Sequence, residues 1–344
     1  MYRFAKTYIY DRMAQLEPWW SGLTYLFAKE AGLNGPRGFE SLRFRHEHNG
    51  MDNILTNTSV TENIYKILTR KDFRNGPLPD GVRKDLVLKN IQEKVNKNLP
   101  IKFLQFWGGS KNINLTVQEA DLCEEATLNQ LAKMNAEVRK IYEPGLFFHI
   151  IPGDERVQIA NKIPKDRTDK YVKSLANFAN KYSGLFQVTP VSVLYAKKEF
   201  YDCFDITRKE LTEKIKKTAN FEKLVKGARN NLMMSGHNSE EEINSQSREA
   251  ALNYSLVRAT EEKVEIFEEF EDYIRSYFVK HIPFYQQIRL NFDDIGMTKP
   301  NLDRSLFFYT GKKGNITQPW QAVGINDGGN IIFASQTKID KYKL

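Results

Sequence analysis

Short apolar runs alternate with longer amphipathic stretches through the middle of the chain. Apolar residues at helical spacing predict helices over residues 62–70 and 82–98, and the continuous apolar run 101–106 predicts a buried strand. The alternation then continues with a helix over about 118–142, a strand over 146–151, a helix over about 167–182 and a strand over 186–195. Strands that alternate with helices of this length are typical of right-handed crossovers and a largely parallel sheet.

The last part of the chain has a different pattern. Residues 197 to about 278 are predicted to be mostly helical, and the acidic segment 261–274 spaces its apolar residues like a buried stripe, which leaves its glutamates on a solvated face. Strands follow at 286–292, 305–310, 321–325 and 330–335, with a strong hairpin signal at 326–329. The fold class expected is α/β, with a Rossmann-like, largely parallel sheet, an antiparallel C-terminal extension and an added helical region.

No internal repeat or interdomain linker divides the chain. Residues 1–80 are aromatic-rich and irregular, and they are predicted to form an N-terminal helical elaboration. Residues 81–344 are predicted to form a single α/β domain of catalytic type, with a helical insertion at about 197–280. This organisation suits a chain of 344 residues, which is long enough to bury a large core.

Composition narrows the class of protein. With 41% hydrophobic and 27% charged residues, the chain resembles a soluble globular protein. It contains no apolar run of membrane-spanning length, and charges interrupt the first residues where a signal peptide would be apolar, so a cytoplasmic location is expected. Cys123 and Cys203 fit no metal or redox spacing, and two reduced thiols are favoured over a disulfide. His46 and His48 lack further ligands nearby in the sequence, so no metal and no cofactor are expected.

A net charge of +8 favours anionic partners. The densest basic stretch is 207–231, which reads as a helix. A solvated helix face is the simpler interpretation, and binding of RNA or another polyanion is the alternative. RNA binding would need aromatic or glycine-rich elements beside the basic face, and Phe221 alone lies close in the sequence.

The loop after the strand 101–106 carries the strongest candidate chemistry. Gly108 and Gly109 are followed by Ser110, Lys111 and Asn112, and a helix then begins near two acidic residues, Asp121 and Glu124. Loops at the carboxyl ends of parallel strands form the ligand crevice of α/β proteins. The glycines allow a ligand to approach the backbone, and the polar side chains offer donors to an anion or a carbonyl. The spacing is neither a Walker A motif nor a dinucleotide fingerprint, so an ordinary turn stays open.

Several short motifs occur in a characteristic order: 101–112, 121–128, 142–145 with the following strand and 154–157, 288–291, and 319–321 with the hairpin at 327–328. In this order they resemble the isocyanide (isonitrile) synthases of the pyoverdine and dityrosine biosynthesis family. The chain departs from the family pattern at three places. Gly109 stands where the family has a lysine, with Lys111 two places later. Gln321 replaces a histidine after Trp320, and an acid near Asp293 replaces another.

The resemblance implies an enzyme of secondary metabolite biosynthesis. Its substrates would be an amino acid and a sugar phosphate: the α-amine condenses with the ketone of ribulose 5-phosphate, and eliminations leave an isocyanide carbon on the nitrogen. Such a reaction needs a cationic clamp, acid/base groups and shielding from water. A diverged member that binds a sugar phosphate or nucleotide for another transfer is an alternative. The sequence leaves the amino acid and the oligomeric state open.

The resemblance also assigns candidate roles. The catalytic candidates are Lys111, Glu124, Asp154 and Gln321, with Glu124 and Asp154 as the acid/base groups. The substrate-binding candidates are Ser110, Asn112, Arg289 and Trp320. Structural interpretations stand beside these: Glu124 would also suit the positive end of a helix dipole, Asp154 a turn, and Trp320 the core.

Overall fold

The computed structural model describes residues 50–74, 82–112, 115–218, 221–233, 240–278, 303–315 and 317–335. From Ile54 onward these residues belong to one compact unit, Ile54–Leu344. Arg289, His46, His48 and the strand expected at 286–292 lie outside the described residues. None of the helices in the described part of the chain is long and apolar enough to cross a membrane. Cys123 and Cys203 carry free thiols.

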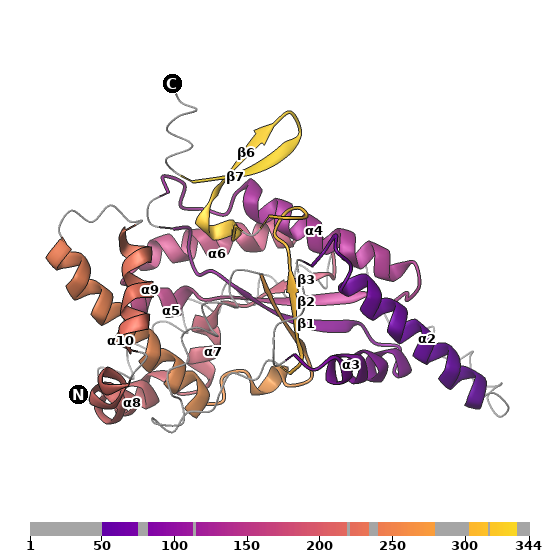
Figure 1. The fold of residues 1–344 in the computed structure, drawn as a ribbon, viewed down its shortest axis with the longest axis horizontal. Helices are drawn as coiled ribbons and strands as arrows, with labels where there is room; N and C mark the ends of the chain where they lie inside the picture. Colours follow the sequence, from indigo (N-terminus) through magenta and orange to yellow (C-terminus); the bar gives the residue numbers. More distant parts are fainter. Residues whose placement is uncertain are drawn as a thin grey trace, which may run out of the picture. The chain divides into compact units, whose positions relative to one another are not determined.

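The described residues form a parallel sheet of five strands in the order β3-β2-β1-β4-β5. The strands are β1 (Ile101–Trp107), β2 (Leu146–Pro152), β3 (Phe186–Val188), β4 (Ile274–Phe278) and β5 (Ser305–Phe308). The chain moves outward from β1 through β2 to β3 and then returns to the other side of β1 with β4 (Figure 1). The strand order therefore reverses between β1 and β4, and the carboxyl ends there are where such sheets bind ligands. The predicted α/β fold with a largely parallel sheet is confirmed.

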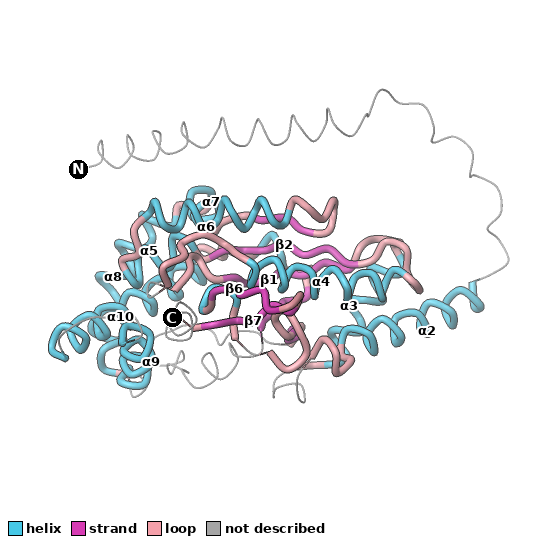
Figure 2. The backbone as a smooth tube through the Cα atoms, turned by 90° about the horizontal axis from the view of Figure 1, so that it is seen from above, coloured by secondary structure: helices cyan, strands magenta, loops and turns pink. Residues whose placement is uncertain are grey.

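Helices cover both faces of the sheet. Their bounds are α2 (Gly50–Leu68), α3 (Lys84–Asn96), α4 (Leu122–Arg139), α5 (Asp154–Asn161), α6 (Lys165–Ala179), α7 (Val191–Lys197), α8 (Phe200–Lys217), α9 (Phe221–Met233) and α10 (Glu240–Lys263). One core packs α2, α3, α4 and α6 against Phe103 and Phe148. The second packs α7, α8, α9 and α10 against Leu104 and Ile151. Figure 2 shows α8, α9 and α10 gathered together, away from α2 and α3.

Two predicted elements differ from the structure. The strand expected over 186–195 ends at Val188, and the apolar run after Pro190 forms the buried helix α7. A short apolar run fits either a strand or a buried helix, and periodicity alone does not distinguish them. The helical stripe expected over 261–274 also ends early: α10 stops at Lys263, Glu265 has a φ of 49°, and β4 begins at Ile274.

The C-terminal hairpin forms as predicted, from β6 (Val323–Asp327) and β7 (Asn330–Ala334). These antiparallel strands make a separate two-stranded sheet, which packs on α4 instead of pairing with β5 (Figure 1). A Cβ on Gly324 would lie 2.5 Å from the Cβ of Leu122, so glycine permits this close approach. The short 3-10 helix Pro319–Gln321 leads into the hairpin and brings Trp320 to the end of β1.

Candidate functional site

The backbones that follow β1 and β2 touch each other. A Cβ on Gly109 would lie 2.2 Å from the carbonyl oxygen of Gly153, a separation that no real side chain tolerates. On the other side of the loop, a Cβ on Gly108 would lie 2.4 Å from Cγ of Trp320. The two glycines therefore serve close packing, and the position that departs from the family lysine has no room for a side chain in this arrangement.

Trp320 is packed into the core beside this loop. Its ring lies 5.9 Å from that of Trp107 and 6.0 Å from that of Phe278, measured between centroids. Its carbonyl oxygen accepts a 2.7 Å hydrogen bond from the backbone N–H of Asn112. The carbonyl of Asn112 accepts in turn from the Arg167 guanidinium at 2.8 Å. Two of the predicted substrate-binding residues are thus joined through their backbones at the end of β1.

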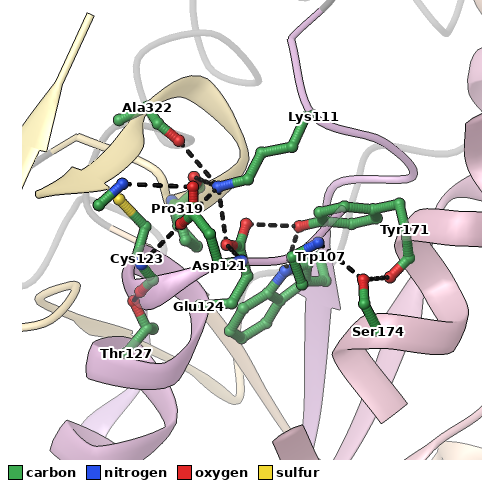
Figure 3. A network of polar contacts seen from close by, with 12 residues as sticks. Trp107, Lys111, Asp121, Cys123, Glu124, Thr127, Tyr171, Ser174, Pro319 and Ala322 are labelled. Carbon is green, nitrogen blue, oxygen red and sulfur yellow. Dashed lines mark hydrogen bonds and ion pairs between the residues drawn. The ribbon is translucent and has the colours of Figure 1, made fainter. Parts of the chain in front are cut away.

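Lys111 is fully buried and holds three segments together. Its Nζ lies 3.0 Å from Oδ1 of Asp121 and 2.7 Å from Oε2 of Glu124, both at the start of α4. It also donates to the carbonyl oxygens of Pro319 at 2.9 Å and Ala322 at 2.8 Å. An ammonium has three N–H groups, and these acceptors satisfy all of them. Lys111 therefore provides a fixed charge that ties the strand-end loop to α4 and to the turn before β6 (Figure 3).

The start of α4 explains why both acids face Lys111. Asp121 and Glu124 form a capping box: the backbone N–H of Asp121 donates to Oε2 of Glu124 at 2.9 Å, and Oδ1 of Asp121 accepts from the N–H of Cys123 at 2.8 Å. Oδ2 of Asp121 also accepts from the N–H of Gly324 at 3.2 Å. The sequence pattern Asp-x-x-Glu thus fixes both carboxylates at the helix start, where the helix dipole favours negative charge.

Glu124 lies at the centre of a buried chain of polar groups. Its Oε1 accepts from the hydroxyl of Tyr171 at 2.9 Å, and that hydroxyl accepts from the indole N–H of Trp107 at 2.9 Å (Figure 3). Burial raises the pKa of Glu124 to about 7, even though the Lys111 ammonium acts to lower it. A carboxyl group that gains and loses its proton near neutrality suits general acid/base catalysis.

Asp154 is a second buried carboxyl group, at the end of β2. It is the first residue of α5, and its Oδ1 accepts a 3.2 Å hydrogen bond from the backbone N–H of Ser192 at the start of α7. Burial raises the pKa of Asp154 to about 6. Gly153, directly before Asp154, touches Gly109, so Asp154 lies beside the loop that follows β1, whereas Glu124 lies in the first turn of α4.

Sequence reasoning missed a buried ionic cluster beside these loops. Glu261, placed by prediction on a solvated face, is 3% exposed, so that expectation is wrong for this residue. Its carboxylate accepts from Arg156 of α5, from the hydroxyl of Tyr195 and from Arg258 one turn earlier in α10. Arg156 lies within a motif singled out by the sequence, but its partner lies on a distant helix that no local pattern indicates.

The two remaining candidates in the described part of the chain are Ser110 and Gln321. Ser110 is buried within the loop beside Lys111, and Gln321 is half-buried beside Trp320.

The basic stretch 207–231 belongs to two helices, since α8 ends at Lys217 and α9 begins at Phe221. In the part of the chain that the structure describes, no three His, Cys, Asp or Glu side chains lie close enough together to hold a metal ion.

Comparisons with known proteins relate the chain to one family and to one fold. A family model described as pyoverdine/dityrosine biosynthesis protein matches residues 91–283, from within α3 through β4. The structure is similar to the crystal structure of the PvcA protein from Pseudomonas aeruginosa, with a TM-score of 0.59 and 12% identity over 82% of this chain and 94% of that chain. A tyrosyl-tRNA synthetase from Archaeoglobus fulgidus gives a TM-score of 0.39 and 12% identity, over 82% of this chain and 73% of that one. Comparison with curated proteins gives no match.

Proposed function

Because this chain belongs to the pyoverdine/dityrosine biosynthesis protein family, we propose that it is an isocyanide-synthase-like enzyme that joins an amino acid to ribulose 5-phosphate. The amine nitrogen adds to the ketone carbon of the sugar phosphate, and loss of water gives an imine. Both carbon–carbon bonds of that carbon then break: C1 leaves as formaldehyde, and C3 to C5 leave as a three-carbon hydroxyketone and inorganic phosphate, so that the former ketone carbon stays on the nitrogen as an isocyanide. The fold, shared with PvcA, supports the proposal because its strand order reverses between β1 and β4, and Lys111 follows β1 in the chain.

The proposal is supported by two buried carboxyl groups, Glu124 in the first turn of α4 and Asp154 at the start of α5, directly after β2. The pKa of Glu124 lies at about 7 and that of Asp154 at about 6. Imine formation requires an acid that protonates the departing hydroxyl and a base that removes the proton of the amine. Two carboxyl groups that exchange protons near neutrality can share these tasks, and the eliminations that follow use the same two groups.

Lys111 has a supporting part in this proposal. Because its ammonium is already bonded to two carboxylates and two carbonyls, it acts as a fixed positive charge beside Glu124 and not as a mobile phosphate ligand. Tyr171 and Trp107 complete the polar chain from the other side of Glu124. The protonation of Glu124 therefore depends on Lys111, which lies beside Oε2, and on Tyr171, which donates to Oε1.

The test is an incubation of the purified protein with pooled amino acids and ribulose 5-phosphate, followed by mass spectrometry. An isocyanide product is heavier than its amino acid by about 10 mass units, because one carbon replaces two hydrogens on the nitrogen. Glu124→Gln keeps the size of the side chain and an acceptor for Tyr171, but it removes the proton-transfer group and also the negative charge beside Lys111, so circular dichroism first confirms that the variant is folded. We expect it to lower product formation by about 10²-fold to 10⁴-fold.

The matched control is Glu125→Gln. Glu125 is the next residue in the same helical turn, and its carboxylate pairs with Lys181 on the surface. This variant should form product at the wild-type rate. Equal losses in both variants would assign Glu124 a structural role alone. Binding of ribulose 5-phosphate by a wild-type protein that forms no isocyanide would instead favour another transfer reaction on the same fold.

A further inference from the structure

Arg167 of α6 contacts the loop that follows β1. It is the third residue of α6, and its NH2 donates to the backbone carbonyl of Asn112 at 2.8 Å and to that of Leu115 at 3.4 Å. Asn112 is the residue after Lys111, whose Nζ lies 2.7 Å from Oε2 of Glu124. The guanidinium of Arg167 is therefore held against the loop that carries the strongest candidate chemistry.

The position of Arg167 on α6 relates it to Glu124 a second time. Tyr171 lies four residues later in the helix, so the two side chains share one face, with about 5 to 6 Å between their Cβ atoms. The hydroxyl of Tyr171 donates to Oε1 of Glu124 at 2.9 Å. One turn of α6 therefore separates Arg167 from the tyrosine that contacts the proposed acid/base group.

The charge of Arg167 lacks the acidic contact that the buried cations have. Lys94, Lys111 and Arg156 are buried, and each contacts a carboxylate. Within the described ranges Arg167 contacts backbone carbonyls alone, through NH2, and its buried Nε has no hydrogen-bond acceptor. Burial lowers the pKa of Arg167, and the smaller effect of Asp166 raises it. Because a guanidinium stays protonated at neutral pH, a positive charge without a carboxylate contact lies at this position.

Arg167 is also more accessible than the lysine of the loop. Its side chain is half-buried and so open to solutes in the surrounding water, whereas Lys111 is fully buried and satisfied by its own partners. Partial removal from water strengthens the attraction of a cation for an anion. Each of the proposed substrates carries one anionic group, the phosphate of the sugar or the carboxylate of the amino acid. Both groups are oxyanions, which a planar guanidinium recognises through its N–H groups.

We infer that Arg167 binds an oxyanion of a substrate, the phosphate of the sugar or the carboxylate of the amino acid, and so places that substrate beside Glu124. The inference rests on the proposed function for the identity of the two substrates. In a purely structural interpretation, Arg167 instead fastens the loop after β1 to α6 through the two carbonyls. Loss of such a tie would weaken the binding of charged and uncharged ligands alike. Only oxyanion binding predicts that the preference for a charged ligand depends on Arg167.

Ligand titrations followed by thermal unfolding measure the affinities, because a ligand that binds the folded protein raises its Tm. One arm compares ribulose 5-phosphate with ribulose, and the other compares each common amino acid with its amide. In the arm whose anion Arg167 contacts, the wild-type protein should prefer the charged ligand by about tenfold to a hundredfold, the range expected for hydrogen bonds to a charged group. Arg167→Met should remove this preference, and Arg167→Lys should keep part of it, because the charge remains. The arm that responds identifies the oxyanion.

Lys173→Met provides the matched control. It removes one positive charge from the same helix, but from an exposed position. This variant should keep the preference for the charged ligand in both arms, and circular dichroism confirms that each variant is folded. A preference that survives in both arms of folded Arg167→Met, that falls equally in Lys173→Met, or that is absent from the wild-type protein overturns the inference. Because binding is measured without turnover, a preference that depends on Arg167 in a protein that forms no isocyanide supports the inference, and the proposed reaction then fails alone.

Discussion

Nζ of Lys111 lies 2.7 Å from Oε2 of Glu124, and both side chains are completely buried. The pair joins the loop after β1 to the start of α4, and β1 is the strand at which the strand order of the sheet reverses. A buried ion pair of this kind is costly to break, because the partner that remains has neither water nor a counter-charge.

Lys111→Met should therefore destabilise the protein by about 3 to 5 kcal/mol, since Glu124 and Asp121 lose their shared cation. Lys181→Met is the control, because Lys181 also lies 2.7 Å from a glutamate of the first turn of α4, but with half of its side chain exposed. It should cost about 1 kcal/mol or less. The free energies of unfolding in urea measure both. Equal costs would show that Lys111 does not act as a structural tie.

The stability of the protein should depend on the protonation of Glu124. The pKa of this group rises from 4.5 to about 7 on folding, so between these pH values the folded state holds a proton that the unfolded chain has lost. Stability contributed by this group is then lost as the pH rises through that window, by an amount on the order of 3 kcal/mol.

Glu124→Gln should flatten this part of the pH profile when unfolding is followed from pH 4 to pH 8. Asp154, with a pKa of about 6, contributes to the same profile in both proteins, so the difference between them isolates Glu124. A difference that is constant with pH would contradict the raised pKa.

Tyr171→Phe should shift the titration of Glu124. The hydroxyl donates to Oε1 of Glu124 and so stabilises the charged form, which means that its removal raises the pKa further. The change also leaves the indole N–H of Trp107 without this acceptor, and it should cost about 1 to 3 kcal/mol. We expect the pH profile of activity to move to higher pH.

Tyr182→Phe is the corresponding control, because Tyr182 lies in the turn after α6 and its hydroxyl donates to Asn129 of α4 near the surface. It should leave both the pH profile and the stability close to those of the wild-type protein. A shift in the profile that appears equally in both variants would rule out a specific role for Tyr171.

Gly109→Ala should destabilise the protein by about 1 to 3 kcal/mol, the usual cost of overpacking. Its Cβ would meet the backbone of Gly153 at 2.2 Å, and backbone atoms give way less readily than a side chain. Gly153→Ala changes the other partner in this contact, but its Cβ would have no neighbour closer than 3.4 Å. It should cost about 1 kcal/mol or less. Thermal unfolding of the two variants compares these costs, and a milder effect of Gly109→Ala would contradict the close contact.

Elements that depend on residues close together in the sequence were predicted correctly. They are the strands β1 and β2, the helix start at Asp121 and Glu124, and the turn between β6 and β7. Strand β4 and helix α7 were assigned wrongly because short apolar runs fit either state until the sheet is assembled.

The side-chain partners of the site depend on distant parts of the chain. The sequence predicts a solvated Glu261, whereas the structure buries it against Arg156. The two residues are 105 positions apart, so no local pattern indicates that they pair. The hydrogen bond between Trp107 and Tyr171 was not predicted, because it forms only when α6 packs on β1. The sequence placed Lys111 and Glu124 near each other, but the carbonyls that complete the shell of Lys111 come from residues 319 and 322.

The measurement that tests the proposed function most directly is an incubation with ribulose 5-phosphate labelled with ¹³C at its ketone carbon. The ketone carbon becomes the isocyanide carbon, so the product should be heavier by about one further mass unit than with the unlabelled sugar phosphate. The amount of labelled isocyanide should fall by about 10²-fold to 10⁴-fold when Glu124→Gln replaces the wild-type protein. A product that lacks the label, or no isocyanide with any amino acid, would contradict the proposed reaction.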